Sequence, residues 1–264
     1  MKLLSFLRSK KKEATKIGLV LSGGGVRGIA HLGVLKALNE KGIFPDYISG
    51  VSAGGLVGVF YADGYKPDDI FEIFNNSNIF DFTKAAIPRK GFMSLDKVKE
   101  ILHESIWAKD FKDLKTPLFV AASNLNEGKI EYFDKGKLID PILASISIPV
   151  LFKPTMINNK TYVDGGVFDN LPISPIKNKC SILIGSHVNP QKEENDLDSM
   201  ISIAERTFHV AIGSSVQENS KDCDLYIEPP ELINFGMFKL DKAKEIYDIG
   251  YQATKDMLSK TRLF

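Results

Sequence analysis

Gly50-Val51-Ser52-Ala53-Gly54 joins an apolar, strand-type segment to a run of small residues with a helical pattern. A serine at such a turn, with one glycine two residues before it and another two residues after it, is typical of a nucleophile elbow. The serine of an elbow takes a strained backbone conformation, and Gly50 and Gly54 let neighbouring chain pass close by. The first N–H groups of the following helix then face any negative charge that forms at the hydroxyl. We therefore predict an α/β fold in which Ser52 is a nucleophile.

A second strand-to-helix turn lies upstream, where Gly23-Gly24-Gly25-Val26-Arg27-Gly28 follows the apolar segment Ile17–Ser22. Acyl transfer needs N–H donors for the oxyanion that develops, and a tri-glycine turn at a helix start exposes backbone N–H groups for that purpose. The order strand, turn, helix, strand, turn, helix implies adjacent parallel strands whose turns share one carboxyl edge. An isolated GxSxG turn is equally compatible with a helix packed closely on a strand, so the first glycine run is what favours catalysis.

A dinucleotide-binding site is the rival interpretation, because Gly23-x-Gly25-x-x-Gly28 also fits the glycine fingerprint of such sites. That fingerprint expects an acidic residue at the end of the second strand, where it holds a ribose hydroxyl. Here the second strand ends in Gly50-Val51-Ser52, and the nearest acid, Asp46, comes before it. The sequence therefore disfavours nucleotide binding.

Length and composition set the domain organisation. The chain has 264 residues, 44% of them hydrophobic, with no break in composition, which predicts one large α/β domain over residues 16–264 after a basic, flexible leader over residues 1–15. A formal charge of +1 argues against nucleic acid as a partner. Cys180 and Cys223 lie far apart without metal-ligand spacing, so we expect buried or idle thiols in a reducing compartment. We also expect neither a metal nor a cofactor.

The leader also bears on location. The apolar patch within Met1–Lys12 is too short for a signal-peptide core, and more basic charge follows it. No other segment is long and apolar enough to span a bilayer. A solvated leader is favoured over a basic amphipathic segment that touches anionic membrane. We expect a cytoplasmic protein, with peripheral contact at the inner membrane surface as the alternative, and the sequence predicts no oligomeric state.

The rest of the chain alternates helices and strands. Residues 78–93 carry many large apolar side chains without a clear period, and a buried connection is favoured there over a flap that lines an acyl-chain pocket. Helices are expected at 28–41, 52–62, 66–76, 94–107, 139–147, 198–216 and 240–258, hairpins at 117–133 and 155–163, and further strands at 180–188 and 224–228.

Asp164 is the candidate base for the elbow serine. It follows a predicted strand and precedes Gly165 and Gly166, which leave its carboxylate uncrowded, although Asp-Gly-Gly is also ordinary turn chemistry. A Ser-Asp-His triad with His187 or His209 would keep the chain order of an α/β-hydrolase. The elbow here follows a single strand, however, and neither histidine stands in a loop of small residues. The residues alone therefore leave two possibilities, a Ser-Asp-His triad or Asp164 as a base without histidine.

Four motifs in order resemble the bacterial patatin-like phospholipases, over about Lys16 to Pro175. They are Ser22-Gly23-Gly24-Gly25-Val26-Arg27-Gly28 with His31-Leu32-Gly33-Val34-Leu35, then Gly50-Val51-Ser52-Ala53-Gly54, then Ala144-Ser145-Ile146-Ser147-Ile148-Pro149, then Asp164-Gly165-Gly166 with Asn170-Leu171-Pro172. The resemblance implies a three-layer α/β/α fold, with a mostly parallel central sheet and antiparallel additions. It also implies a Ser-Asp dyad that hydrolyses acyl esters of phospholipids and other lipids without a metal.

Carried over to this sequence, the resemblance implies that Ser52 is the nucleophile and Asp164 the base. It further implies that Gly24 and Gly25 are oxyanion donors, with Gly23 and Gly28 in the same turn, and that Arg27 is a cation near the phosphate or oxyanion. A catalytically silent lipid- or protein-binding regulator on the same fold is the alternative that a covalent active-site probe would distinguish.

Overall fold

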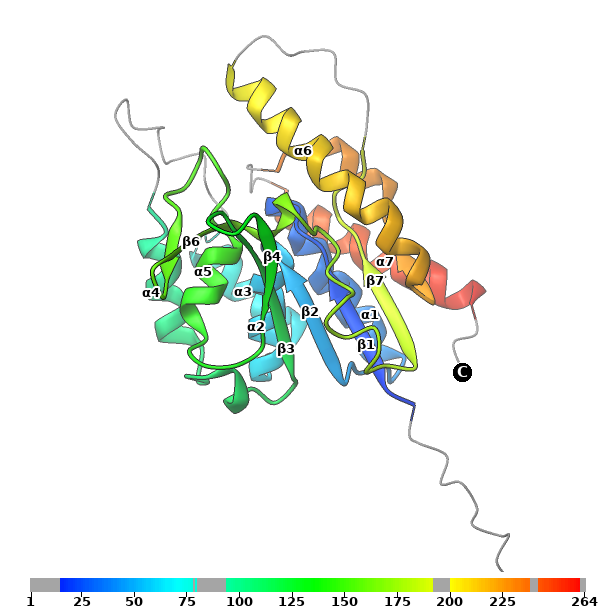
Figure 1. The fold of residues 1–264 in the computed structure, drawn as a ribbon. Helices are drawn as coiled ribbons and strands as arrows, with labels where there is room; N and C mark the ends of the chain where they lie inside the picture. The colour runs from blue at the N-terminus through cyan, green and yellow to red at the C-terminus, as the bar shows by residue number, and fades with distance from the viewer. Residues whose placement is uncertain (1–14, 78, 80–93, 192–199, 238–241, 262–264) are drawn as a thin grey trace, which may run out of the picture.

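The computed structural model describes residues 15–77, 79, 94–191, 200–237 and 242–261 (Figure 1). Its centre is an eight-stranded sheet in the order β5-β6-β3-β2-β1-β7-β8, with β4 paired to β3 off this path. The strands are β1 (Ile17–Leu21), β2 (Tyr47–Val51), β3 (Leu118–Asn124), β4 (Lys129–Phe133), β5 (Thr155–Ile157), β6 (Lys160–Asp164), β7 (Ile182–Ser186) and β8 (Leu225–Ile227). From β3 to β8 the neighbouring strands are parallel, whereas β4 and β6 run antiparallel to β3 and β5 runs antiparallel to β6.

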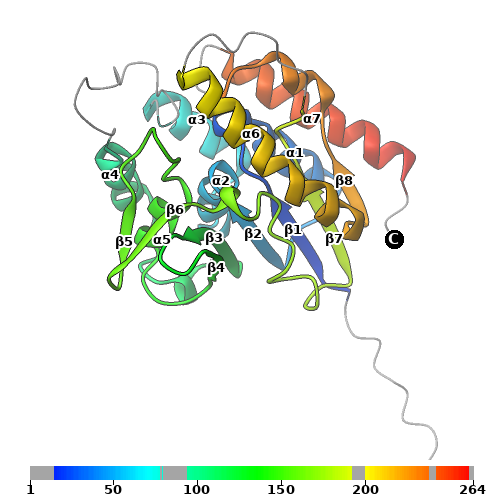
Figure 2. The ribbon, with the colours of Figure 1, turned by 45° about the horizontal axis from the view of Figure 1, so that its top comes forward.

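Helices cover both faces of this sheet. The helices are α1 (Ala30–Glu40), α2 (Ala53–Asp63), α3 (Pro67–Ser77), α4 (Asp96–Ser105), α5 (Ile139–Ser145), α6 (Met200–Asn219) and α7 (Ala243–Lys260), with short 3-10 helices η1 (Gly25–Ile29), η2 (Phe111–Asp113), η3 (Gly165–Val167), η4 (Ser220–Asp222) and η5 (Pro230–Asn234). Figure 2 shows α6 on one face of the sheet, with α1 and α7 on the other. No helix in the described ranges is both long and apolar enough to cross a membrane.

Side chains of β1 alternate between two apolar clusters, one on each face of the sheet. Leu19 and Leu21 join the large cluster that packs α1 to α5 and α7 against the sheet. Val20 points the other way, into a smaller cluster with Val216 of α6 and Leu171. Because successive side chains of a strand point to opposite faces, this continuous apolar run is what a strand buried on both faces requires. The predicted three-layer α/β/α arrangement is confirmed.

Most predicted elements are confirmed, including adjacent parallel β1 and β2 and both hairpins. The helix expected over 94–107 is shorter, however, because it ends at Ser105, where Ile106 turns to extended backbone and Trp107 is exposed. Similarly, the strand expected over 180–188 covers only Ile182–Ser186. The flap prediction falls outside the described residues except for Ile79, as do residues 1–14 of the leader.

Two strands meet end to end along one edge of β3. Its other edge is occupied by β4, so β2 and β6 share the remaining one. Val51, the last residue of β2, pairs with Ala121, and Asp164, the last residue of β6, pairs with Ala122. A Cβ added at Gly165 would lie only 2.9 Å from Val51 Cγ2. This junction brings the chain just after Val51 close to the chain around Asp164, although the two are remote in sequence.

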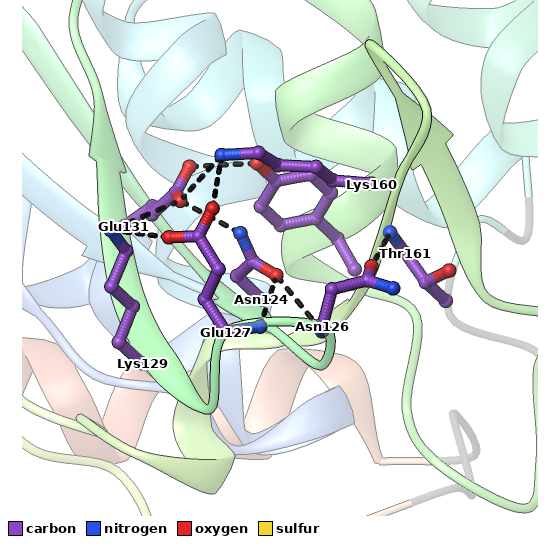
Figure 3. Close-up of polar contacts among 8 residues, drawn as sticks. Asn124, Asn126, Glu127, Lys129, Glu131, Lys160 and Thr161 are labelled. Atoms are coloured by element: carbon purple, nitrogen blue, oxygen red, sulfur yellow. Dashed lines mark hydrogen bonds and ion pairs between the residues drawn. The ribbon is translucent and has the colours of Figure 1, made fainter.

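The outer end of β6 is held by a polar network around Glu131, which Figure 3 shows. Glu131 accepts hydrogen bonds from Asn124 Nδ2 at 2.8 Å and from Tyr162 Oη at 2.7 Å. Lys160 pairs with Glu127 at 2.5 Å. These contacts tie the β3–β4 turn to the strand that ends in Asp164.

Candidate active site

Ser52 stands at the turn between β2 and α2, in a backbone conformation that L-residues rarely adopt (φ 53°, ψ −126°). Such a conformation costs on the order of 1–3 kcal/mol and persists only when the surroundings enforce it. Here the Ser52 N–H donates to the buried Ser145 Oγ at 2.8 Å. A Cβ added at Gly54 would lie 2.3 Å from the Leu21 carbonyl oxygen, and one at Gly50 would lie 2.6 Å from that of Gly54. The strained elbow predicted from the sequence is confirmed.

The tri-glycine turn leaves two N–H groups unused. Gly23 N–H donates to Asn170 Oδ1 at 3.1 Å, and Val26 N–H donates to the Met237 carbonyl oxygen at 2.8 Å. Between them, the N–H groups of Gly24 and Gly25 donate to no group among the described residues. Gly25 and Ser52 line the same pocket. The turn therefore offers free donors near the serine, as an oxyanion site needs.

Asp164 is almost fully buried, with 1% of its surface exposed. Its Oδ1 accepts from Gly166 N–H at 2.8 Å. Burial raises the pKa of this carboxyl to about 7, while hydrogen bonding from the Ser52 hydroxyl and the Gly166 N–H opposes the rise. Oδ2 has no partner of ordinary hydrogen-bond geometry among the described residues. The Ser52 hydroxyl is thus near enough to affect the pKa of Asp164, but no hydrogen bond of ordinary geometry joins the two side chains in the described part of the chain.

Arg27 and Gly28 take up other contacts in the same turn. Arg27 is buried, and it donates from Nε to the Phe235 carbonyl oxygen at 2.8 Å and from Nη1 to Asn189 Oδ1 at 2.6 Å. Burial lowers its pKa to about 10, so it stays charged at neutral pH. A Cβ added at Gly28 would lie 2.4 Å from that of Ala53, so this glycine lets η1 touch α2. The role of Arg27 beside an anion stays a prediction.

Two buried histidines are engaged away from the serine. His31 bonds from Nδ1 to Ser186 Oγ at 2.8 Å and from Nε2 to the Ser22 carbonyl oxygen at 2.9 Å, and burial lowers its pKa to about 4. His187 Nδ1 lies 2.8 Å from Glu228 Oε1. Neither imidazole bonds to Ser52 or Asp164. The neutral His31 instead supports the strand end that leads into the tri-glycine turn.

Other segments of the fold carry His103, His209 and Asp46. His103 is exposed on α4, and His209 belongs to α6. Asp46 accepts from Ile17 N–H at the amino end of the sheet, opposite the glycine turns, which removes the acid that a dinucleotide site would use. Both cysteines are free, and the described residues contain no cluster of three or more metal-ligating side chains.

An apolar pocket opens beside Ser52. Its interior holds a cavity volume of about 20 Å³, and the roughly 310 Å³ of space between its walls includes open solvent at the mouth. Its lining is Gly25, Ser52, Ala53, Leu56, Ile79, Val98, Ile146 and Ile148. Apart from the serine hydroxyl, the side chains of this lining are apolar, which suits a hydrocarbon chain.

Two residues beside the elbow and the tri-glycine turn have roles that the sequence does not indicate. Ser145 holds the elbow amide, and Asn170 holds the Gly23 amide. Both stand within the quoted motifs, but nothing in their neighbours along the chain indicates which distant amide they bind.

Comparisons with known proteins identify the family of the chain. The sequence model of the patatin-like phospholipase family matches residues 19–176. Lysophospholipase NTE1 of Kluyveromyces lactis is 30% identical over 96% of this chain, and lysophospholipase nte1 of Emericella nidulans is 26% identical over 93%. The chain spans about a fifth of the length of these curated relatives, 20% and 18% respectively. Both come from eukaryotes, so the bacterial part of the resemblance stays untested.

Among solved structures, VipD from Legionella pneumophila shares the fold. It superposes with a TM-score of 0.56 at 14% sequence identity, over 93% of this chain and 67% of VipD. With the family model covering more than half of the sequence and a relative at 30% identity over nearly all of it, the chain belongs to the patatin-like phospholipase family.

Proposed function

We propose that this chain is a serine hydrolase of lipid acyl esters, in which Ser52 is the nucleophile, Asp164 the base, and the N–H groups of Gly24 and Gly25 the oxyanion donors. One observation carries the proposal: a serine on a strained elbow lies beside a buried carboxyl whose pKa burial raises to about 7. A base with a pKa near the working pH can both accept and return a proton.

In the acylation half, Asp164 takes the Ser52 proton as Oγ attacks the ester carbonyl carbon. The oxyanion of the tetrahedral intermediate accepts hydrogen bonds from Gly24 and Gly25. When the intermediate collapses, the ester C–O bond breaks and the leaving alcohol takes the proton from Asp164. In the second half, water gives a proton to Asp164 and attacks the acyl-enzyme, and Ser52 regains that proton as the acid leaves.

The substrate class follows from the pocket and the relatives. The apolar lining beside Ser52 suits the acyl chain of a lipid. The relatives are named lysophospholipases, which supports a phospholipid with a single acyl chain as the first substrate to test. We also propose that residues 16–264 form one catalytic domain that meets its substrate at a lipid surface, and that the chain is cytoplasmic.

The test is covalent labelling with a fluorophosphonate probe, combined with turnover of p-nitrophenyl esters of graded chain length. Wild type should be labelled, and Ser52→Ala should lose labelling together with turnover, by on the order of 10⁴-fold or more. The matched control is Ser49→Ala, since Ser49 is buried on β2, the strand that leads to Ser52, and its Oγ has no partner in the described part of the chain. Ser49→Ala should keep both fluorophosphonate labelling and ester turnover. An unlabelled wild type would instead support a silent binding protein on this fold.

A further inference from the structure

Asn170 lies in the loop after η3, with 1% of its surface exposed. Its backbone N–H donates to Ser215 Oγ on α6 at 3.0 Å. Its Oδ1 accepts from Gly23 N–H at 3.1 Å, which fixes the orientation of the carboxamide because a backbone N–H needs an acceptor. The side chain therefore ties the tri-glycine turn to the loop that follows Asp164, with Nδ2 facing away from Gly23.

Two buried polar atoms near this side chain lack partners. Neither Asn170 Nδ2 nor Asp164 Oδ2 has a hydrogen-bond partner in the described part of the chain. One is a donor and the other an acceptor. Leaving such groups unpaired in a folded interior costs free energy, so an unpaired donor and an unpaired acceptor beside the candidate nucleophile and base call for an explanation.

The glycines on either side show how close the carboxamide lies to both catalytic candidates. A Cβ added at Gly23 would lie 2.5 Å from Asn170 Oδ1 and 3.1 Å from the Cβ of Ser52. A Cβ added at Gly166 would lie 2.9 Å from Asn170 Oδ1 and 3.1 Å from Asp164 Oδ1. The carboxamide is thus wedged between the two loops, with the serine beside one and the aspartate beside the other.

We propose that Asn170 is a positioning residue for the water that hydrolyses the acyl-enzyme, a step that rests on the proposed function. Nδ2 donates a hydrogen bond to the water oxygen while Asp164 Oδ2 accepts its proton. The remaining hydroxide oxygen forms the new bond to the acyl carbon, and the bond to Ser52 Oγ breaks as Oγ takes the proton back from Asp164. Every proton is accounted for by these groups.

The hydrogen bond from Asn170 Nδ2 should matter more in deacylation than in acylation. In acylation the attacking oxygen is held covalently on Ser52, so its position is set by the elbow. In deacylation the attacking oxygen belongs to a free water, whose orientation depends on its hydrogen bonds. Removing Nδ2 alone should therefore slow the second half and leave the first nearly unchanged.

Asn170→Asp makes that change, since it keeps an oxygen for Gly23 N–H and replaces the donor. In pre-steady-state hydrolysis of a p-nitrophenyl ester, measured at the plateau of each pH profile, we expect kcat to fall about 10- to 100-fold. KM should fall in parallel, so that kcat/KM stays within about threefold and a burst near one equivalent remains. Acyl-enzyme should accumulate and be visible by intact mass.

Asn219→Asp is the matched control. Asn219 Nδ2 donates to Asp169 Oδ1 at 3.0 Å and to the Leu171 carbonyl oxygen at 2.9 Å, so it anchors the two neighbours of Asn170 from α6 without touching Gly23. This variant should unfold at lower temperature, while kcat and KM each stay near their wild-type values. Asn170→Ala, which removes both hydrogen-bonding atoms, should slow acylation as well.

The outcomes separate the two proposals. If wild type is labelled by the fluorophosphonate but Asn170→Asp loses kcat and kcat/KM equally, Asn170 only holds the turn and this inference is wrong. An unchanged kcat in Asn170→Asp would also show that this inference is wrong. If wild type is not labelled at all, the proposed function fails and the water role fails with it.

Discussion

Ser52 and Asp164 reach the same edge of the sheet by different routes. Ser52 sits at a turn between parallel β2 and the helix that follows it directly, and close backbone contacts at Gly54 fix its conformation. Asp164 ends an antiparallel strand that reaches this edge only because β6 pairs with β3 where β2 stops. Local chain geometry therefore builds the nucleophile side of the site, and pairing between distant segments builds the base side.

The largest effect expected on the base side is that of Asp164→Asn. Without a base, kcat for ester hydrolysis should fall by about 10³- to 10⁴-fold. Asp169→Asn is the matched control, because Asp169 is also buried and burial also raises its pKa, yet its carboxyl accepts from Tyr132 Oη at 2.7 Å. It should change kcat less than about tenfold. Equal losses in the two variants would contradict the assignment of the base.

The pH dependence of the wild type gives a second readout, with Asp164→Asn as the reference. Turnover should rise with pH and reach half its plateau near pH 7, because Asp164 must be ionised to accept a proton. Its pKa in the folded chain lies above the ordinary value of 3.8, so protonated Asp164 stabilises the fold below about pH 4. That contribution is lost as pH rises to about 7. In urea unfolding, wild type should lose stability relative to Asp164→Asn between pH 4 and 7. The opposite sign would contradict the raised pKa.

On the nucleophile side, adjacent glycines of α2 should respond oppositely to alanine. At Gly54 the added Cβ would meet the Leu21 carbonyl oxygen at 2.3 Å, so Gly54→Ala should lower the free energy of unfolding by about 1–3 kcal/mol and lower kcat. At Gly55 the nearest atom is Ser145 Oγ at 3.4 Å, an ordinary contact. Gly55→Ala should raise the free energy of unfolding by about 0.5–1 kcal/mol. Urea titrations of both variants measure the difference, and a destabilised Gly55→Ala would show that local geometry alone does not set this turn.

The smallest effect is expected far from the chemistry, in the network of Figure 3. Glu131→Gln weakens the contacts with Asn124 and Tyr162, and should lower the free energy of unfolding by about 1 kcal/mol with kcat changed less than about twofold. Glu127→Gln, which alters a solvent-exposed pair with Lys160, should leave the melting temperature unchanged. A large loss of kcat in Glu131→Gln would mean that this end of β6 also controls the position of Asp164.

The same contrast explains what the sequence could predict. Apolar runs followed by glycine turns encode β1, β2 and the elbow locally, so the strained conformation of Ser52 followed from the motif. Asp164 could be named as a candidate base, but its approach to the serine depends on a strand register that no local pattern carries. Likewise, the bonds from Gly23 N–H to Asn170 and from Ser52 N–H to Ser145 join residues 147 and 93 positions apart. These contacts could be found only once the fold was assembled.

The end-to-end meeting of β2 and β6 on β3 also sets the order in which activity can appear during synthesis. Chains emerge from the ribosome N-terminus first, so β1, β2 and α2, which carry the elbow, leave before Ser145, which holds the elbow amide. The strand that brings Asp164 docks on β3 only after two hairpins have been made. On the proposed mechanism, a nascent chain carries its serine without a proton acceptor and cannot hydrolyse esters until β6 has emerged.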